Sequence, residues 1–474
     1  MPLLATFQRR IAKGGVPLLV ALVTRAHARL LDDGHPFCSH LIAKVFSSRK
    51  PQHVDLLTAV VDGIPTMLAD SSAKDGRPSS NETSEGISIM LADSDAVTPN
   101  LWSAQQWPEE RQSPTMRQDC TLSFHFAKAN AVVDGTALPY DTTNPVSRRL
   151  QLPVSNTIFQ NGYTSTLIAQ RWSSADASGV EPEMLQIKRS RLPNQILFMD
   201  DFVASSGMSN TCTLNMPLTA MTPPRKVGDS VGNIIRTFQT VDGSNKDKPI
   251  PASTELEQSV SRWMEMQTHT NEGADIWALV TPRTHKTNNP GTKKVGLQLA
   301  LESGSHLHKV LSGGGGWGAK QGLLSLDPDT KYGKGSQEGG YPFDDDSTFE
   351  AQQQQAFGKI VNPGDIVTFY VFDRASPSIN PADDGHRKTS DLGPSIALTT
   401  IPSTADKMPI SIAKNVETLD SQAIFAWNCF GMASEGMALT IDRSESARSG
   451  EMSCSVQTKI DVPHTQYSHG TIRF

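Results

Sequence analysis

The chain has 474 residues, enough for two or three domains of the usual size of about 150 residues. Its net charge of −6 at pH 7 gives no electrostatic basis for nucleic acid or an anionic membrane as the principal partner. No apolar run approaches the about 18 residues that a membrane-spanning helix needs, so we expect no membrane span. The five cysteines include no C-x-x-C pair, which favours free thiols over a disulfide scaffold or a cysteine-based zinc site.

The first segment, residues 1–15, contains Arg9, Arg10 and Lys13 and has no acidic residue. This composition is typical of a mitochondrial targeting segment, so we treat residues 1–15 as a candidate for one. We expect an intracellular protein in the cytoplasm or nucleus, with mitochondria as the alternative compartment.

The chain then begins a β-α-β unit. Residues 17–23 form a continuous apolar run, which is typical of a strand buried on both faces. Residues 36–47 place their apolar side chains on one broad helical face. Residues 54–62 form a second apolar run, so the pattern predicts a helix between two parallel strands.

The rest of the first half reads as strands separated by polar loops. The Asn161-Gly162 pair lies between two apolar stretches, which predicts a hairpin of strands 156–160 and 163–172. The polar stretches 70–85 and 97–117 are expected to be exposed loops that offer surface to protein partners. The remaining strands are expected at 86–91, 122–126, 184–188, 195–199 and 211–216.

The second half is expected to begin with a helix and to end in strands. Thr254 and Glu257 fit a capping box at the start of a helix that runs to residue 266. A strand at 295–301 and a short helix at 303–311 are then expected to lead into a glycine-rich stretch. The remaining strands of this half are expected at 276–280, 366–372, 395–401, 423–429, 437–441 and 453–462.

These elements predict a mixed fold between α/β and α+β, with two strand-rich halves, a β-α-β start and few helices. We expect an N-terminal domain at 16–222, a connection at 223–252 and a C-terminal domain at 253–474. The C-terminal domain would carry the glycine-rich loop, residues 312–322.

The glycine-rich loop is the main candidate for a ligand site. Four consecutive glycines, among them Gly314 and Gly315, are followed by Trp317 and then by Lys320. Backbone N–H groups, a flat indole and a cation together are able to line a site for an anionic ligand. The alternative is a tight structural loop with Trp317 packed on it. The spacing does not match a Walker loop, because Ala319 follows Gly318.

Two further patterns were weighed as catalytic groups. Residues 228–232 match G-x-S-x-G by letter, but a second apolar stretch follows where a nucleophile elbow needs a helix. A turn into a strand is therefore expected there. His306 and His308 are read either as a surface pair or as an acid–base group working beside Lys320. We assign no catalytic residue, no metal site and no cofactor.

Two stretches of the second half resemble the C-terminal module of the FIST-domain family. Residues 363–373 resemble its Gly-Asp pair followed by a hydrophobic strand, and residues 423–431 resemble its later apolar strand with cysteine and glycine. The β-α-β unit is similar in layout to the N-terminal FIST module. The resemblance implies a small-molecule sensing or binding module, with amino-acid-like compounds as one ligand class, and supplies no catalytic residues. Asn428 and Cys429 lie in the second stretch and join the expected ligand contacts.

Three hypotheses about function follow. The first is a non-catalytic FIST-like protein that binds a small ligand at Gly314, Gly315, Trp317, Lys320, Asn428 and Cys429, and at the carboxyl ends of its strands. The second is an enzyme that acts on an anionic small molecule. The third is a structural subunit of a larger assembly, in mitochondria if residues 1–15 direct it there, with the polar loops as partner surfaces.

Overall fold

The structure is a computed structural model of the chain. Strands predominate and helices are few among the residues it describes, which confirms the expected mixed fold. The described residues are 15–47, 51–65, 83–102, 120–126, 132–133, 136–137, 146–163, 166–174, 184–199, 212–214, 216, 218–239, 249–266, 275–283, 297–313, 322–330, 332, 360–372, 396–399, 429–443, 454–460 and 465–470.

The described elements occur in the following order along the chain. The helices are η1 (Arg25–Leu31), α2 (Phe37–Val45), α3 (Ser94–Val97), α4 (Ile158–Asn161), α6 (Ala252–Met266) and α7 (Leu297–Glu302). The strands of the first half are β1 (Pro17–Thr24), β2 (His53–Val61), β3 (Ile64–Pro65), β4 (Thr83–Ser84), β5 (Ile87–Asp93), β6 (Thr121–Phe126), β7 (Val132–Val133), β8 (Thr136–Ala137), β9 (Val146–Pro153), β10 (Ile168–Ser174), β11 (Met184–Arg191), β12 (Asn194–Phe198) and β13 (Cys212–Leu214). The later strands are β14 (Leu218–Ala220), β15 (Arg225–Val231), β16 (Ile234–Phe238), β17 (Ile250–Pro251), β18 (Ile276–Thr281), β19 (His306–Gly313), β20 (Leu324–Leu326), β21 (Ile366–Phe372), β22 (Ile396–Thr399), β23 (Cys429–Ser434), β24 (Met437–Arg443), β25 (Cys454–Ile460) and β26 (Thr465–Gly470).

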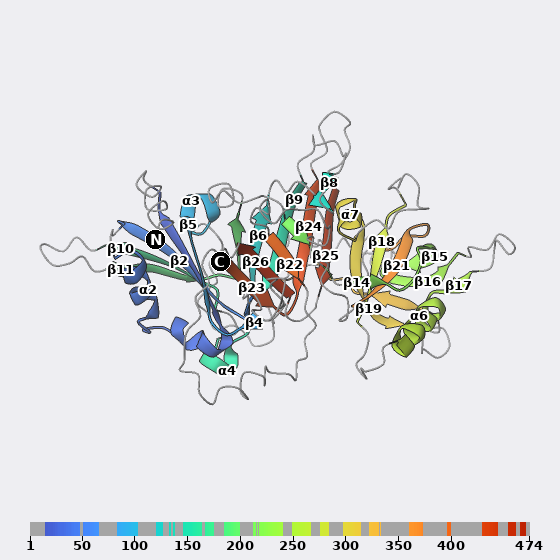
Figure 1. The fold of residues 1–474 in the computed structure, drawn as a ribbon, viewed down its shortest axis with the longest axis horizontal. Helices are drawn as coiled ribbons and strands as arrows, with labels where there is room; N and C mark the ends of the chain where they lie inside the picture. Colours follow the sequence, from blue (N-terminus) through green and yellow to red (C-terminus); the bar gives the residue numbers. More distant parts are fainter. Residues whose placement is uncertain are drawn as a thin grey trace, which may run out of the picture.

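The N-terminal sheet has the order β11-β10-β2-β1-β5 and lies at one end of an elongated molecule (Figure 1). β1 and β2 run parallel, with Leu18 opposite Asp55, which confirms the predicted β-α-β unit. Every side chain of β1 is buried, because the two faces of the sheet have different covers. Leu19 lies in the cluster with α2, whereas Leu18 lies in the cluster shared with the central strands.

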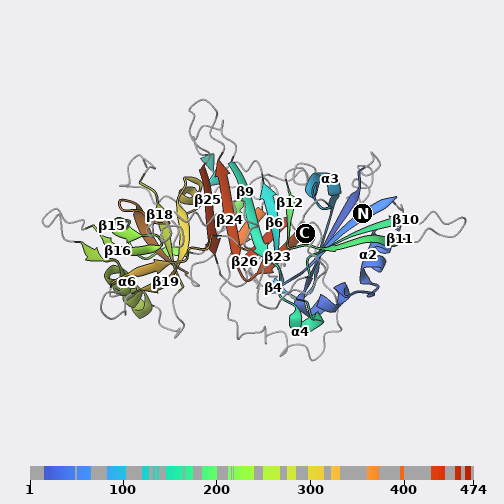
Figure 2. The ribbon, with the colours of Figure 1, turned by 180° about the vertical axis from the view of Figure 1, so that it is seen from behind.

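The central part consists of two further sheets, which lie between the N-terminal sheet and the far end of the molecule in both views (Figures 1 and 2). Their orders are β12-β6-β9-β24-β25 and β13-β22-β26-β23. Phe124 of the first sheet stacks on Tyr467 of the second, with 4.0 Å between the ring centroids. Both side chains are fully buried, so this contact lies inside the core between the two sheets.

The far end of the molecule is a closed barrel of β15, β16, β20, β19, β18 and β21. The path of pairings closes because β21 pairs with β18 as well as with β15. Small and large apolar side chains such as Ala278 and Phe369 fill the barrel, and Leu256 of α6 joins the same cluster. The strand 366–372, expected from the sequence, is the central strand β21 of this barrel.

The barrel contacts the central sheet through the outer face of β18 and β19. Trp277, Leu279 and Leu307 belong to the cluster of the central strands rather than to the barrel interior. Thr458 of β25 donates a hydrogen bond to the carbonyl oxygen of Leu307. Arg148 of β9 forms a buried ion pair with Glu302 of α7, with 2.7 Å between the charged atoms.

The expected division into consecutive domains is wrong. Strands near the C-terminal end of the chain return to partners in the first half: β24 pairs with β9, and β22 pairs with β13. Ala433 also forms an isolated bridge with Gly63 beside the N-terminal sheet. The stretch 253–474 is therefore not a unit of its own. The expected connection 223–252 also contains β15 and β16, which are barrel strands.

Three local predictions are also corrected. The Asn161-Gly162 pair does not form a hairpin turn, because Gly162, with φ of 79°, ends the short helix α4 instead. The expected strand 295–301 is replaced by α7, and the expected helix 303–311 is replaced by β19. α6 begins at Ala252, so Thr254 lies inside the helix and is not its N-cap.

Candidate functional site

Most of the expected ligand residues fall outside the described part of the chain. These are Gly314, Gly315, Trp317, Lys320 and Asn428. The two ends of the glycine-rich loop are described: Gly313 ends β19 and is paired with Leu324 of β20. The loop therefore joins two antiparallel strands, and the helix that a dinucleotide-binding fingerprint needs after its glycines is replaced by a strand.

Cys429 begins β23, opposite Gly470 of β26. It lies in a central sheet, whereas Gly313 lies in the barrel, so the described parts of the expected site belong to different sheets. Gly431, two residues later, allows a close approach of strands, because a Cβ there would lie 2.5 Å from the carbonyl oxygen of Tyr467. This segment of the FIST-like stretch serves the core in the described structure.

His306 and His308 lie on the same face of β19, because the segment is extended rather than helical. Their ring centroids are 6.2 Å apart. His308 is buried, which corrects the reading as a surface pair, and its Nδ1 lies 3.0 Å from the carbonyl oxygen of Asp327. Burial lowers the pKa of His308 to about 4, although the hydrogen bond to Asp327 opposes this shift. A neutral imidazole held by a backbone carbonyl is best explained as a structural group.

The G-x-S-x-G letters at 228–232 span the turn between β15 and β16, as expected. Ser230 lies in β15, and its hydroxyl donates to the carbonyl oxygen of Val361. The Gly-Asp pair of the first FIST-like stretch forms a turn before β21, where Gly364 has φ of 94°. The carboxylate of Asp365 accepts hydrogen bonds from the backbone N–H groups of Arg283 and Asn362. Both motifs therefore hold neighbouring loops together.

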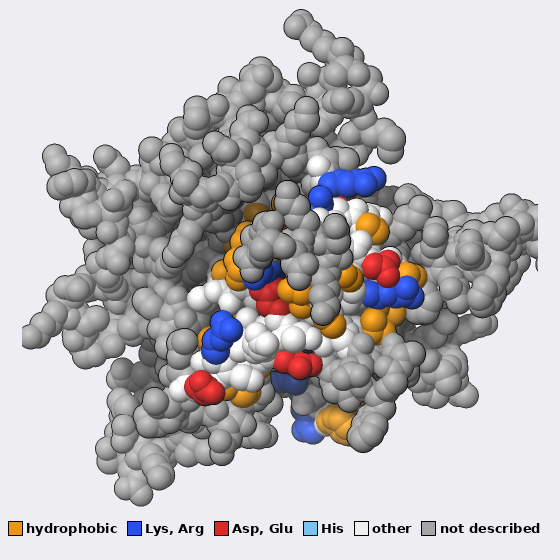
Figure 3. All heavy atoms as spheres, turned by 90° about the vertical axis from the view of Figure 1, so that its right-hand side faces the viewer, with side chains coloured by type: hydrophobic (Ala, Val, Ile, Leu, Met, Phe, Trp, Pro, Cys, Tyr) orange, Lys and Arg blue, Asp and Glu red, His pale blue; other side chains and the backbone are white. Residues whose placement is uncertain are grey.

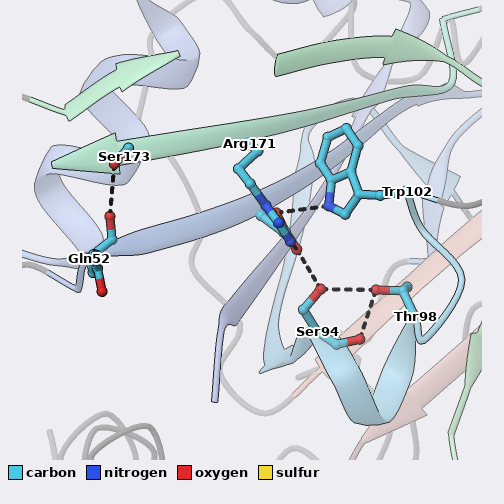
Figure 4. A network of polar contacts seen from close by, with 7 residues as sticks. Gln52, Ser94, Thr98, Trp102, Arg171 and Ser173 are labelled. Atoms are coloured by element: carbon cyan, nitrogen blue, oxygen red, sulfur yellow. Dashed lines mark hydrogen bonds and ion pairs between the residues drawn. The ribbon is translucent and has the colours of Figure 1, made fainter. Parts of the chain in front are cut away.

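A polar network surrounds the fully buried Asp55 at the start of β2 (Figure 4). Arg171 donates to both carboxylate oxygens, at 2.7 and 2.8 Å. The hydroxyl of Ser94 donates to one oxygen at 2.6 Å, and the indole N–H of Trp102 donates to the other at 3.2 Å. Arg171 and Lys188 also lie against the Trp102 ring. The carboxylate is saturated with donors, so this network is a structural tie between β2, β10 and α3.

A second polar network lies at the opposite end of the same strands, where β1 and β2 reach their carboxyl ends. We call it the Arg25 cluster and define it as Arg25, Asp62, Ser155 and Glu435. Arg25 and Asp62 directly follow β1 and β2, respectively. The guanidinium of Arg25 lies 2.5 Å from the Asp62 carboxylate and 3.0 Å from the Glu435 carboxylate. Ser155 donates a hydrogen bond of 2.6 Å to Asp62.

The two carboxylates of the Arg25 cluster differ in their exposure. The side chain of Asp62 is 9 % exposed, that of Arg25 is 38 % exposed, and that of Glu435 is 74 % exposed. Burial raises the pKa of Asp62, while the charge of Arg25 and the Ser155 hydrogen bond oppose this shift. The pKa of Arg25 is raised because the attraction of both carboxylates outweighs the effect of burial. Asp62 thus fixes a cation that reaches the surface.

The Arg25 cluster retains unused hydrogen-bonding capacity, unlike the Asp55 network. The Nε atom of Arg25 is buried and has no hydrogen-bond partner among the described residues. The neighbouring helix α4 contacts η1 and contributes two more such atoms, Oε1 of Gln160 and Nδ2 of Asn161. Buried polar atoms are normally satisfied in native proteins, by protein, by water or by a ligand. The cluster is therefore the best candidate for a ligand site in the described structure.

The position of the Arg25 cluster agrees with the general expectation that ligands bind at the carboxyl ends of parallel strands. The individual residues were missed by the sequence analysis. The available signal was a polar residue directly after each of the first two apolar strands, Arg25 after 17–24 and Asp62 after 53–61. No pattern in the sequence indicates that Glu435, 410 positions from Arg25, is part of the same cluster.

The described surface adds two observations. Basic, acidic and hydrophobic side chains are interspersed on the described part of the barrel's outer end (Figure 3). None of the described helices combines the length and apolar character required to cross a membrane. Within the same described residues, no group of three or more His, Cys, Asp or Glu side chains is placed to hold a metal ion.

Comparison with known proteins yields no relative. No protein-family model, no curated protein and no solved structure matches this chain. The resemblance to the FIST-domain family therefore stays a prediction from the sequence.

Proposed function

We propose that this protein is a non-catalytic binding protein for a small ligand that carries a carboxylate, with Arg25 as the anchor. The observation that carries the proposal is the state of the Arg25 guanidinium. It is 38 % exposed, it is held in place from below by the buried Asp62, and its Nε has no hydrogen-bond partner among the described residues. A FIST-like sensory role inside the cell is the wider form of this proposal.

A carboxylate is the ligand group that suits this arrangement. A guanidinium presents its N–H groups in a planar fork that matches the two oxygens of a carboxylate. Arg25 already contacts two carboxylates of the chain itself, at 2.5 and 3.0 Å. The nearby Gln160 and Asn161 side chains offer one acceptor and one donor for the rest of a small polar ligand.

The enzymatic alternative has less support. Lys320, its anion anchor, lies outside the described residues, and His308 is buried with its Nδ1 against a backbone carbonyl. A general base needs a pKa near the working pH, whereas burial lowers the pKa of His308 to about 4.

Titration with small carboxylates tests the proposal. Acetate, succinate and glutarate are titrated into the wild-type protein by calorimetry, with acetamide and succinamide as uncharged probes. We expect Arg25→Ala to weaken carboxylate binding by about 10- to 100-fold, because it removes a charge-assisted hydrogen bond of about 1.5–3 kcal/mol. Arg25→Lys keeps the charge but loses the fork, and should show an intermediate loss.

Arg29→Ala is the matched control, since Arg29 lies on the same helix, is exposed and makes one long hydrogen bond to the backbone of Gln160. It should leave carboxylate binding unchanged. The proposal fails if no carboxylate binds the wild-type protein, or if Arg25→Ala and Arg25→Lys both bind as the wild type does.

A further inference from the structure

We infer that Glu435 is a built-in competitor for the ligand: its carboxylate occupies the outer side of the Arg25 guanidinium and must leave when a ligand carboxylate binds. This inference rests on the proposed function, and it adds a regulatory element to the same site. The evidence is the unequal attachment of the two carboxylates that Arg25 contacts.

Asp62 is the fixed partner of Arg25. Its side chain is 9 % exposed and accepts a hydrogen bond from Ser155. Its backbone N–H donates to the carbonyl oxygen of Ala433, at 3.2 Å. Displacing Asp62 would leave a buried charge unpaired, which is costly. A ligand therefore does not compete with Asp62.

Glu435 is the replaceable partner. Its side chain is 74 % exposed, so water solvates the carboxylate as soon as it leaves Arg25. An exposed ion pair of this kind shifts the equilibrium towards the paired state by a factor of only about one to five. The carboxylate of Glu435 has the same chemistry as the proposed ligand, so it blocks the site without closing it permanently.

The backbone beside Glu435 is firmly held, which keeps the competing carboxylate close to Arg25. Ser434 donates a hydrogen bond of 2.6 Å to the carbonyl oxygen of Pro153, and the backbone of Ala433 pairs with that of Gly63. Met437, on the other side, is fully buried at the start of β24. Only the side chain of Glu435 is thus required to move when the site opens.

A competitor that is part of the chain lowers the apparent affinity by the fraction of molecules in which it is bound. Removing the charge of Glu435 should therefore tighten the binding of an external carboxylate. We expect Glu435→Gln and Glu435→Ala to bind acetate and succinate about two- to fivefold more tightly than the wild type. Acetamide and succinamide should not gain affinity.

Glu85→Gln provides the matched control for the loss of one nearby negative charge. Glu85 is exposed and precedes Gly86, whose carbonyl oxygen accepts a hydrogen bond from the N–H of Thr24 beside Arg25. The control should bind acetate and succinate as the wild type does. An equal gain in Glu85→Gln would show a general charge effect and would overturn the competitor role.

The calorimetric titrations separate the two proposals. Tighter binding in both Glu435 variants, lost again when Arg25→Ala is added, supports the competitor role. Binding that depends on Arg25 but is unchanged or weaker in the Glu435 variants overturns the competitor role and leaves the proposed function in place. The absence of carboxylate binding in the wild type and in both Glu435 variants overturns both.

Discussion

Buried polar residues of this protein differ in how fully their hydrogen-bonding groups are used. The carboxylate of Asp55 receives donors from Arg171, Ser94 and Trp102, and so has no free position for a ligand. Arg25, in contrast, keeps a buried Nε without a partner among the described residues. This difference in saturation, rather than the number of charges, distinguishes the candidate site from the structural network.

His308 predicts a pH dependence of stability at the residue scale. Burial lowers its pKa to about 4 from the ordinary value of 6.5. Between these two pH values the unfolded chain binds a proton that the folded chain does not, so the free energy of unfolding decreases as the pH falls through this window. A difference of this size corresponds to about 3 kcal/mol.

Urea unfolding between pH 7 and 4 measures this effect, with the pH range taken from the ordinary and the lowered pKa of His308. His308→Gln should lose stability less steeply than the wild type as the pH falls. His40→Gln, which changes an exposed histidine of α2, should keep the slope of the wild type. Identical slopes in all three proteins would contradict the assignment of the effect to His308.

At the element scale, strand pairing overrides local preference around the glycine-rich loop. The sequence predicts a strand and then a helix between residues 295 and 311, whereas the structure has α7 followed by β19. β19 pairs with β18 on one side and with β20 on the other, which supplies backbone partners that a helix would not use. Alternation of buried Leu307 with the neighbouring histidines was the available signal for a strand.

Gly322 supplies the prediction at this scale, because it leads into β20 with φ of 85°. A Cβ at this position would lie 2.8 Å from the Cβ of Pro251. Gly34 has nearly the same φ, 82°, and no atom within 4 Å of such a Cβ. Gly322→Ala should therefore carry both backbone strain and a steric clash, and Gly34→Ala the backbone strain alone.

We expect the backbone strain to cost about 1–2 kcal/mol in both variants. The clash should cost about 1–3 kcal/mol more in Gly322→Ala. The midpoint of urea unfolding measures the difference between the two variants. A Gly322→Ala protein no less stable than Gly34→Ala would show that Pro251 moves away without cost.

At the scale of the whole molecule, the last described strands complete sheets that begin in the first half of the chain. β24 and β25 extend the sheet of β12, β6 and β9, and β23 lies near the end of β2 through the bridge between Gly63 and Ala433. The barrel is therefore placed between two stretches of sequence that fold together. Its outer face is covered by β25, as the hydrogen bond from Thr458 to Leu307 shows.

This arrangement predicts the behaviour of chain fragments. The fragment 1–222 lacks β23 to β26, so Leu150 and Phe124 would lose buried neighbours in the core. We expect the fragment to show no cooperative unfolding in urea when it is made alone. Making it together with the fragment 223–474 should restore a cooperative transition, because the partner strands are then present.

Circular dichroism during urea titration measures this transition. A cooperative transition of fragment 1–222 alone, with a midpoint like that of the full chain, would contradict the prediction. It would instead support two separate halves.

The sequence by itself determined the local elements of this protein and the absence of several chemistries. Apolar runs identified β1, β2 and β21, since burial on both faces requires apolar side chains at every position. The tertiary structure alone decided which distant segments meet, and with them the candidate site. Arg25, Asp62 and Glu435 converge because sheet pairing, which no short pattern encodes, brings the ends of β1, β2 and β23 together.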